Sequence, residues 1–209
     1  MSVVPDPPDP FDPLEELLPQ GARLYRAFAA APGRDAATFN PGHGTSRFSF
    51  FGEPVVPTLY LAQTDEAAVC EAILRDVPQP GGVLLPEQYR DHVVAAVTTR
   101  RELRLAQFLG AGLARLGVRA HELTDTPSRE YDRTVAWGEA AHDAGFDGVV
   151  WMAGRLNTDR AYVLFGDRVP SADLSIEPDH ARIFAAGPDV TWLIDFCATR
   201  KVDVLLSPL

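Results

Sequence analysis

Within the first 75 residues, four side chains combine the residue types needed to hold a dinucleotide and to break a C–N glycosidic bond. They are Arg26, Arg47, Tyr60 and Glu71. A guanidinium group presents its N–H donors in a rigid fork that matches phosphate oxygens, and the face of a tyrosine ring attracts a flat cation such as nicotinamide by roughly 0.5–2 kcal/mol. A carboxylate stabilises the oxocarbenium-like charge that develops as the leaving group departs. Because nicotinamide leaves as a neutral molecule, a site with a single carboxylate is sufficient.

Each of these residues also has an ordinary structural explanation. Arg26 is compatible with a salt bridge, and Arg47 with a clamp on the backbone carbonyls of its own loop. Tyr60 is compatible with a core position that leaves its hydroxyl at the rim. Glu71 falls at the edge of the apolar stripe of its helix, so it either faces water or lines a pocket between helix and sheet. Only the joint order and spacing of the four residues favours the functional interpretation.

The segment from residue 43 to residue 75 contains three of these four residues. Arg47 lies among aromatic residues, and a turn at residues 52–54 leads from there into the apolar run 55–61, which is typical of a short buried strand and carries Tyr60 near its end. Thr64 is the predicted N-cap of a helix that carries Glu71. The apolar stripe of this helix consists of Val69, Cys70, Ile73, Leu74 and Val77.

The order of these residues resembles the RES-domain family of bacterial toxins. The family pattern is a Tyr-Arg pair, a Gly-Arg-aromatic turn, a Gly-x-Pro turn, a Val-x-Tyr-x-Ala strand and a glutamate on the next helix. The corresponding residues here are Tyr25-Arg26, Ser46-Arg47-Phe48, Gly52-Glu53-Pro54, Leu59-Tyr60-Leu61-Ala62 and Glu71. A looser likeness continues through residues 131–138 and 145–151, so that the resemblance covers roughly residues 21–170.

The resemblance implies that NAD is a substrate and that no prosthetic group is needed. It assigns catalytic roles to Glu71, Arg47 and Tyr60, and substrate binding to Arg26. The other residues that we expect at the substrate are two members of the matched motifs and two nearby hydroxyls: Tyr25, Phe48, Ser49 and Thr134. The implied activity is that of an NAD glycohydrolase or phosphorylase, and the implied partner is an antitoxin similar to Xre-type DNA-binding repressors.

One departure from the family pattern leaves alternatives open. The family has a serine after the strand that follows its Gly-Phe-Asp-Gly turn, and this chain has Ala153 in that region. Either a hydroxyl such as that of Thr134 or Ser49 replaces the serine, or the domain is a catalytically impaired binding module. Transfer of ADP-ribose to a protein is a further alternative. The sequence does not distinguish water, phosphate and protein as acceptors.

Composition and length predict one globular domain. With 209 residues and 46% hydrophobic content, the chain suits a single α+β domain spanning residues 14–209. We expect residues 1–13, which are rich in proline and aspartate, to form a disordered tail. Strands outnumber helices without regular alternation, so small, mainly antiparallel sheets with flanking helices are expected. The resemblance adds that the fold is similar to that of ADP-ribosyltransferases, with two small sheets around a nucleotide cleft.

Charge and motif content exclude several classes of protein. The net charge of −10 argues against direct nucleic-acid binding, which needs clustered lysine and arginine. No apolar run approaches the ~20 residues of a membrane span, and the acidic, proline-rich start does not look like a signal peptide, so a cytoplasmic location is expected. Cys70 and Cys197 cannot form a disulfide framework, and no Cys/His cluster has metal-ligand spacing. The oligomeric state, self-association included, stays open.

The remaining elements are predicted from periodicity and turn residues. Strands are expected at residues 22–30, 92–99, 147–153, 160–165 and 190–196, with a further edge strand at 202–206. Helices are expected at residues 130–144, where Gly145 ends the helix, and at 180–186. Residues 14–18 are expected to form a short amphipathic turn. Residues 101–118 divide into a strand followed by a short helix.

Overall fold

The computed structural model describes residues 4–206 and is built on one large, mostly antiparallel sheet. The order of its strands is β1-β6-β7-β8-β3-β2-β5-β9, and β6 and β7 are the parallel pair. The strand bounds are β1 (Glu15–Leu18), β2 (Arg23–Ala29), β3 (Thr58–Ala62), β5 (His92–Thr99), β6 (Leu103–Phe108), β7 (Gly148–Met152), β8 (Arg160–Phe165) and β9 (Leu174–Ile183). A separate parallel pair joins β4 (Val83–Leu84) to β10 (Asp203–Val204).

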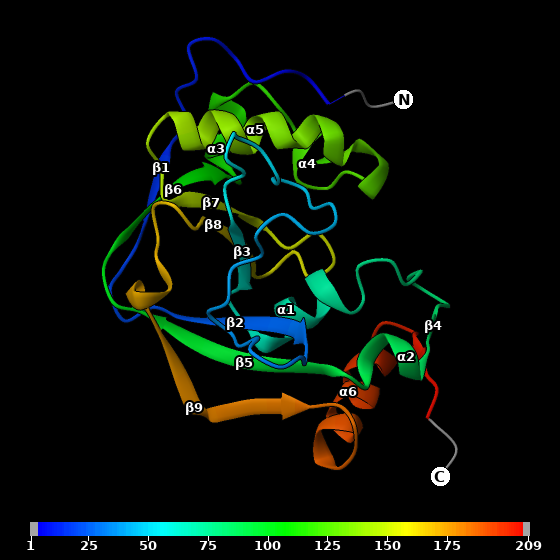
Figure 1. Cartoon of the computed structure of the whole chain (residues 1–209). Helices are drawn as coiled ribbons and strands as arrows, with labels where there is room; N and C mark the ends of the chain where they lie inside the picture. Colours follow the sequence, from blue (N-terminus) through cyan, green and yellow to red (C-terminus); the bar gives the residue numbers. More distant parts are fainter. Residues whose placement is uncertain (1–3, 207–209) are drawn as a thin grey trace.

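The large sheet is nearly divided between β2 and β3. These neighbouring strands share one residue pair, Tyr25 with Ala62, whereas β2 pairs with β5 along the whole of Arg23–Ala29. The strands therefore form two groups, β1-β6-β7-β8-β3 and β2-β5-β9, which lie one above the other in Figure 1. The prediction of small, mainly antiparallel sheets with flanking helices is confirmed, with the correction that a single pair of residues links the two groups.

Helices cover the sheet at three places. Helix α1 (Asp65–Ala72) packs against β2 and β3, α5 (Tyr131–Asp143) packs against β7, and α6 (Pro188–Ala198) packs near β9 and β10. Four shorter helical segments are α2 (Pro86–Tyr89), α3 (Ala111–Arg115), α4 (Ala120–Leu123) and the 3₁₀ turn η1 (Ser128–Glu130). A second 3₁₀ turn, η2 (Ser171–Asp173), precedes β9. No helix in residues 4–206 is both long enough and apolar enough to cross a bilayer.

Helix α1 forms as its sequence predicts. The Thr64 hydroxyl accepts a hydrogen bond from the Ala67 N–H at 3.1 Å, which satisfies one of the free donors of the first turn. The predicted apolar stripe is buried at every position, from Val69 to Val77. This packing fixes the rotation of the helix and carries Glu71 to the seam between α1 and the sheet.

Three predictions of secondary structure were wrong, and in each the chain was locally ambiguous. Residues 14–18 were expected to form an amphipathic turn, but they form β1, which pairs with β6. Residues 180–186 were expected to form a helix, but most of them belong to the edge strand β9. Residues 190–196 were expected to form a strand, but they lie in α6, where Leu193 and Cys197 bury one helical face.

The residues at the start of α6 explain why a helix forms where a strand was predicted. Gly187 adopts a φ of +84°, and Pro188 occupies the first turn, where its missing N–H costs nothing. Short apolar runs do not distinguish strand from helix by themselves. The predicted edge strand at 202–206 is confirmed for Asp203–Val204, which pair with β4.

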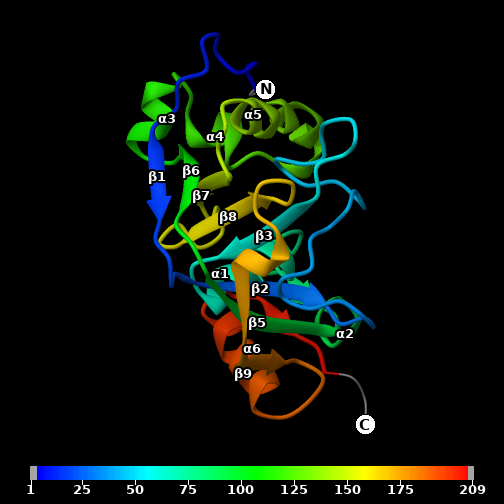
Figure 2. The same ribbon diagram turned by 60° about the vertical axis from the view of Figure 1, so that its left-hand side comes forward.

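The expected disorder of the N-terminal tail is corrected for residues 4–13. Val4 is 2% exposed, the Pro5 carbonyl accepts a hydrogen bond from the Trp137 indole at 2.8 Å, and the Phe11 ring packs edge-on against Phe108 and Trp137. Both views show this segment near α5 (Figures 1 and 2). Composition predicted disorder because few apolar side chains are present, but two of them reach the core. Residues 1–3 lie outside the described part of the chain.

Replacing Phe11 by alanine tests this packing. Because Phe→Ala changes in a core cost about 3–5 kcal/mol and Phe11 is only partly buried, we expect a loss of about 2–3 kcal/mol, or a melting temperature lower by roughly 5–10 °C. Thermal unfolding followed by circular dichroism measures the change. Leu17→Ala, at a side chain that is 50% exposed, is the control and should shift the melting temperature little. An unchanged melting temperature for the Phe11 variant would show that the segment is not packed.

Candidate active site

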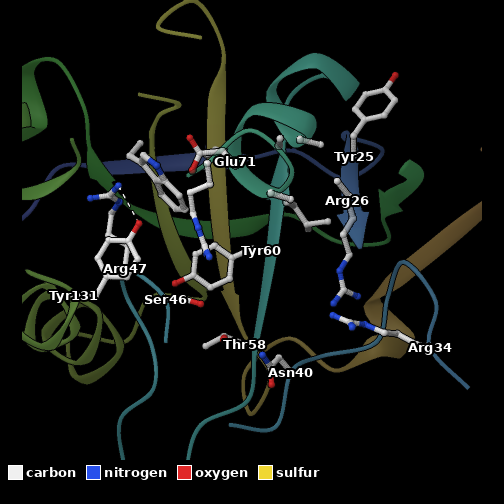
Figure 3. A pocket seen from close by; sticks show the side chains of 18 residues that line it. Tyr25, Arg26, Arg34, Asn40, Ser46, Arg47, Thr58, Tyr60, Glu71 and Tyr131 are labelled. Atoms are coloured by element: carbon white, nitrogen blue, oxygen red, sulfur yellow. Dashed lines mark hydrogen bonds between the residues drawn. The ribbon is translucent and has the colours of Figure 1, made fainter. Parts of the chain in front are cut away.

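A cavity of about 180 Å³ opens where β2 and β3 diverge. Arg26, Arg47, Tyr60 and Glu71 all line it, although they come from β2, a loop, β3 and α1. Figure 3 shows Arg47, Tyr60 and Glu71 on one side and Arg26 on the other. Small side chains make room for the cavity: Ala27, Ala62, Ala68, Ala72 and Ala161. The tertiary structure thus brings the four predicted residues to one place.

A second cavity, of about 470 Å³, shares part of its wall with the first. Arg47, Glu71, Arg75 and Tyr131 line both cavities. Together the two cavities form an elongated site with Glu71 and Arg47 near its middle. Such a site suits an extended ligand better than a small one.

The Arg47 guanidinium is held in place by the segment before α5. Its Nη1 donates to the Thr126 hydroxyl at 2.5 Å and to the Thr126 carbonyl at 3.1 Å, and its Nη2 lies 3.4 Å from the Tyr131 hydroxyl. The guanidinium carbon also lies 5.0 Å from the centre of the Tyr131 ring, within cation–π range. None of the carboxylates in residues 4–206 forms an ion pair with Arg47. Its positive charge therefore stays available to a ligand.

The backbone that carries Arg47 is fixed from two sides. The Tyr60 hydroxyl accepts a hydrogen bond from the Phe48 N–H at 3.0 Å and bonds the Ser49 hydroxyl at 3.1 Å. The Thr134 hydroxyl donates to the Arg47 carbonyl. Helix α5 approaches closely at Gly138, where a Cβ atom would lie 2.4 Å from the Phe48 carbonyl oxygen. Strand β3 and helix α5 thus hold the turn between them.

Three residues that we expected at the substrate hold this turn instead. The side chains of Phe48, Ser49 and Thr134 are 0%, 2% and 0% exposed, and the wall of neither cavity includes them. Phe48 packs edge-on against Phe108 and Trp151 in the core. The prediction that these residues contact substrate is corrected, because their polar groups already have partners within the protein.

Glu71 lies in an environment that disfavours its charge. Burial raises the pKa of this carboxyl group, while the positive charge of Arg47 and the backbone of Gly154 act in the opposite direction. The described residues offer it no ion-pair partner within 4.0 Å. A partly buried carboxylate without a fixed counter-charge is free to interact with a positive charge on a ligand.

Tyr60 combines a structural role with a place in the cavity wall. Burial raises the pKa of its hydroxyl to about 12, so the phenol stays neutral at physiological pH. Its ring packs edge-on against Trp151, with centroids 6.0 Å apart. The hydroxyl is used for holding the Arg47 turn, so the ring is the part that remains for a ligand.

Tyr25 and Arg26 lie on opposite faces of β2, as predicted. Arg26 is 6% exposed, and its Nη1 donates to the carbonyls of Asp35 and Thr38 at 2.9 and 2.6 Å. Burial and the nearby charge of Arg34 lower the pKa of Arg26 to about 10. The Tyr25 ring points away from Tyr60 and Glu71 in Figure 3. It packs edge-on against His180, so Tyr25 borders the cavity without facing its centre.

Several residues of the cavity wall were not predicted. Tyr131 belongs to the looser part of the family likeness, which was the sequence feature that could have identified it as a residue of the cavity wall. Arg34 and Asn40 lie in a loop without a periodic pattern, so the sequence gave no reason to select them. Thr58 and Trp151 each have a buried polar atom, Oγ1 and Nε1, that has no partner within residues 4–206. Unpaired buried polar atoms are costly, and both of these belong to residues of the cavity wall.

Ala153, which departs from the family pattern, lies outside both cavities. It is 0% exposed, and its N–H donates to the Asp159 carbonyl at 2.9 Å. The missing hydroxyl therefore removes no group from the walls described here. Across residues 4–206 no three histidine, cysteine or acidic side chains come close enough to hold a metal ion.

Comparisons with known proteins agree with this architecture. The family model described as "RES domain" matches residues 23–190. Among solved structures, a chain of the M. tuberculosis MbcT–MbcA toxin–antitoxin complex aligns with a TM-score of 0.56 and 13% sequence identity, over 79% of this chain and 85% of that chain. At that identity the likeness concerns the fold alone. No curated protein sequence matches the chain.

Removing the Tyr60 hydroxyl tests its role in the turn. In Tyr60→Phe the buried Phe48 N–H loses its acceptor, so we expect a loss of roughly 1–3 kcal/mol in the free energy of unfolding, measured by urea denaturation. Tyr89→Phe is a matched control, since its hydroxyl donates to the Leu205 carbonyl far from the site. Tyr89→Phe removes the hydroxyl donor and leaves the carbonyl of the exposed Leu205 without it, where water can replace the donor. The loss in the free energy of unfolding should therefore be smaller for this control than for Tyr60→Phe. Equal stability of Tyr60→Phe and the wild type would disprove the role.

The raised pKa of Glu71 predicts a stability effect with a defined sign. Between its ordinary value of 4.5 and its raised value in the fold, the native state binds more protons than the unfolded state, so stability falls as pH rises. Glu71→Gln avoids this loss. We expect the variant to be more stable than the wild type at pH 8, with the difference closing as pH falls toward 4.5. Urea denaturation across this pH range measures it, with exposed Glu139→Gln as control. A variant less stable than the wild type at pH 8 would contradict the prediction.

Proposed function

The chain belongs to the RES domain family, and on this premise we propose that it cleaves the bond between nicotinamide and ribose in NAD. One observation carries the proposal. Arg26, Arg47, Tyr60 and Glu71, which match the family motifs, line a single cavity despite their separation in sequence. NAD is the substrate, and the reaction needs no resident cofactor.

Binding of the dinucleotide draws on the arginines. Arg26 and Arg47 lie at opposite sides of the cavity, and neither is neutralised by a carboxylate of residues 4–206. Guanidinium groups suit phosphate oxygens because they donate two parallel hydrogen bonds. The net charge of −10 gives the chain no general affinity for polyanions. The two arginines of the cavity therefore suit the binding of one specific anionic ligand.

Cleavage draws on Glu71 and on the aromatic wall. When the C–N bond breaks, its electron pair stays on nicotinamide, which leaves neutral, and positive charge develops on the ribose. The Glu71 carboxylate stabilises this charge at short range inside a poorly solvated cavity, where electrostatic interactions are stronger than in water. Arg47 opposes the effect of burial on the pKa of Glu71, and so favours the carboxylate form that this role requires. The Tyr60 and Trp151 rings exclude water from one side of the site.

The electrophilic ribose carbon then accepts an oxygen nucleophile. With water the products are ADP-ribose, nicotinamide and a proton. With inorganic phosphate a C–O–P linkage forms, and the product is ADP-ribose carrying an added phosphate. Both acceptors fit the proposal, and a glycohydrolase and a phosphorylase differ only in this step.

We also propose that the chain is the toxin of a toxin–antitoxin pair. The solved chain whose fold it shares belongs to the MbcT–MbcA toxin–antitoxin complex, and family membership supports the same assignment. An antitoxin resembling Xre-type repressors, bound over the cavity, would keep NAD out. The alternative of a silent binding module has less support, because Ala153 lies outside both cavities.

The decisive measurement is nicotinamide release from NAD by purified protein. We expect release by the wild type, and a loss of about 10²-fold or more in kcat for Glu71→Gln, since the stabilising charge is gone. Glu139→Gln, an exposed change on α5, should keep full activity. The assay is run with and without inorganic phosphate, and the products are separated by chromatography.

Two outcomes bear on the alternatives. Nicotinamide release with label from NAD recovered on protein would indicate transfer to a protein acceptor. Absence of release by protein free of any partner, under all conditions, would refute NAD cleavage.

A further inference from the structure

Two arginines meet at the end of the cavity away from Glu71. Arg26 and Arg34 both line the cavity, and Figure 3 shows their guanidinium groups next to each other, across the cavity from Glu71 and Arg47. Arg34 does not belong to any motif of the sequence. Two like charges that share one wall need an explanation, because they repel each other.

The fold itself imposes their proximity. Arg26 donates through Nη1 to the carbonyls of Asp35 and Thr38, and so anchors the loop that begins at Arg34. The Arg34 N–H donates to the Ala31 carbonyl, which fixes the start of that loop. The Asp35 carboxylate accepts hydrogen bonds from the Ala37 N–H and the Thr38 hydroxyl. Arg26 thus holds a second arginine beside itself by bonding the backbone that carries it.

The positive charge of the pair is not balanced by an ion pair. Neither Arg26 nor Arg34 lies within 4.0 Å of a carboxylate oxygen in residues 4–206, although the chain has 29 acidic against 19 basic residues. Asp35 is the carboxylate that acts on Arg26, and its oxygen Oδ1 is engaged within its own turn. The partly buried His92 near Arg34 has its pKa lowered by burial and by the charge of Arg34, so its neutral form is favoured.

The two arginines also have donors to spare. Within residues 4–206, every hydrogen bond of the Arg26 side chain is made by Nη1. The Nε and Nη2 atoms of Arg26 therefore have no partner among the described residues. Arg34 is exposed, and its side chain makes no hydrogen bond to the described residues. A ligand with several acceptor oxygens and negative charge would satisfy both groups.

We propose that Arg26 and Arg34 form a phosphate-binding subsite at this end of the cavity, with Arg34 as a substrate-binding residue that the family motifs do not include. The inference rests on the proposed function and sharpens it. It fixes the direction of the dinucleotide, with phosphate at Arg26 and Arg34 and the cleaved bond at Glu71. A nucleoside without phosphate would lack this anchor.

The phosphate has two possible sources, the pyrophosphate of NAD and free phosphate acting as nucleophile. Arg34→Gln separates them, because Arg34 is exposed and its replacement should not affect folding. Arg133→Gln, an exposed arginine on α5 outside both cavity walls, is the matched control. Initial rates of nicotinamide release are measured for NAD and for nicotinamide riboside, with and without inorganic phosphate.

If the subsite holds the substrate, Arg34→Gln raises the KM for NAD by about tenfold or more, with kcat within about twofold, since a charge-assisted contact is lost in binding. The rates with nicotinamide riboside stay at the wild-type level. If the subsite holds free phosphate, the phosphate-free KM for NAD is unchanged, and the phosphate concentration needed for phosphorolysis rises about tenfold. Either result supports the subsite.

Kinetics of Arg34→Gln that equal those of Arg133→Gln in both arms would overturn the inference. An independent binding measurement keeps it testable if the wild type does not cleave NAD. Titration calorimetry with pyrophosphate then compares the wild type, Arg34→Gln and Arg133→Gln. Weaker binding by Arg34→Gln alone supports the subsite even though the proposed function fails, and equal binding by all three overturns it.

Discussion

The hydrogen bond from the Phe48 N–H to the Tyr60 hydroxyl connects the two parts of the site. It joins strand β3 to the turn that carries Arg47, at a distance of 3.0 Å. The phenol stays neutral because burial raises its pKa to about 12, so the bond persists over the physiological pH range. On the other side of the turn, Thr134 and Gly138 of α5 hold the same backbone. With the turn fixed, Arg47 lies where its charge acts on Glu71.

The near division of the sheet supplies the space for this arrangement. A fully paired β2 and β3 would bring their side chains together, whereas the single pair of Tyr25 with Ala62 lets the strands separate. Alanine side chains at the junction keep the gap open. Residues of both strand groups can then reach one ligand, which explains how Arg26 on β2 and Tyr60 on β3 line the same cavity.

Several electrostatic features of the site lower the stability of the folded state. Glu71 is partly buried without an ion-pair partner, Arg26 and Arg34 are held together against their repulsion, and Trp151 and Thr58 leave polar atoms unbonded in the described structure. Each of these features disfavours folding, and a ligand with a positively charged glycosidic centre and negatively charged phosphates would relieve the first two. Such strain is expected at functional sites, where local stability is lower than packing alone would give. The surrounding aromatic core, to which Phe11 contributes from the N-terminal segment, offsets it.

The sequence by itself determined the elements whose signals are local. The N-cap at Thr64 and the apolar stripe placed α1, and the run ending near Ala62 placed β3. The resemblance to the RES-domain family then singled out Glu71 and Tyr60 on these two elements. Local patterns could not decide α6 and β9, because a short apolar run forms whichever element lets it bury its side chains. Nor could they show that Thr134 bonds Arg47, 87 residues away, or that Arg34 lies beside Arg26. Hydrogen bonds and charge interactions between distant segments exist only after the chain has folded, so only the tertiary structure decided which side chains hold the site and which face it.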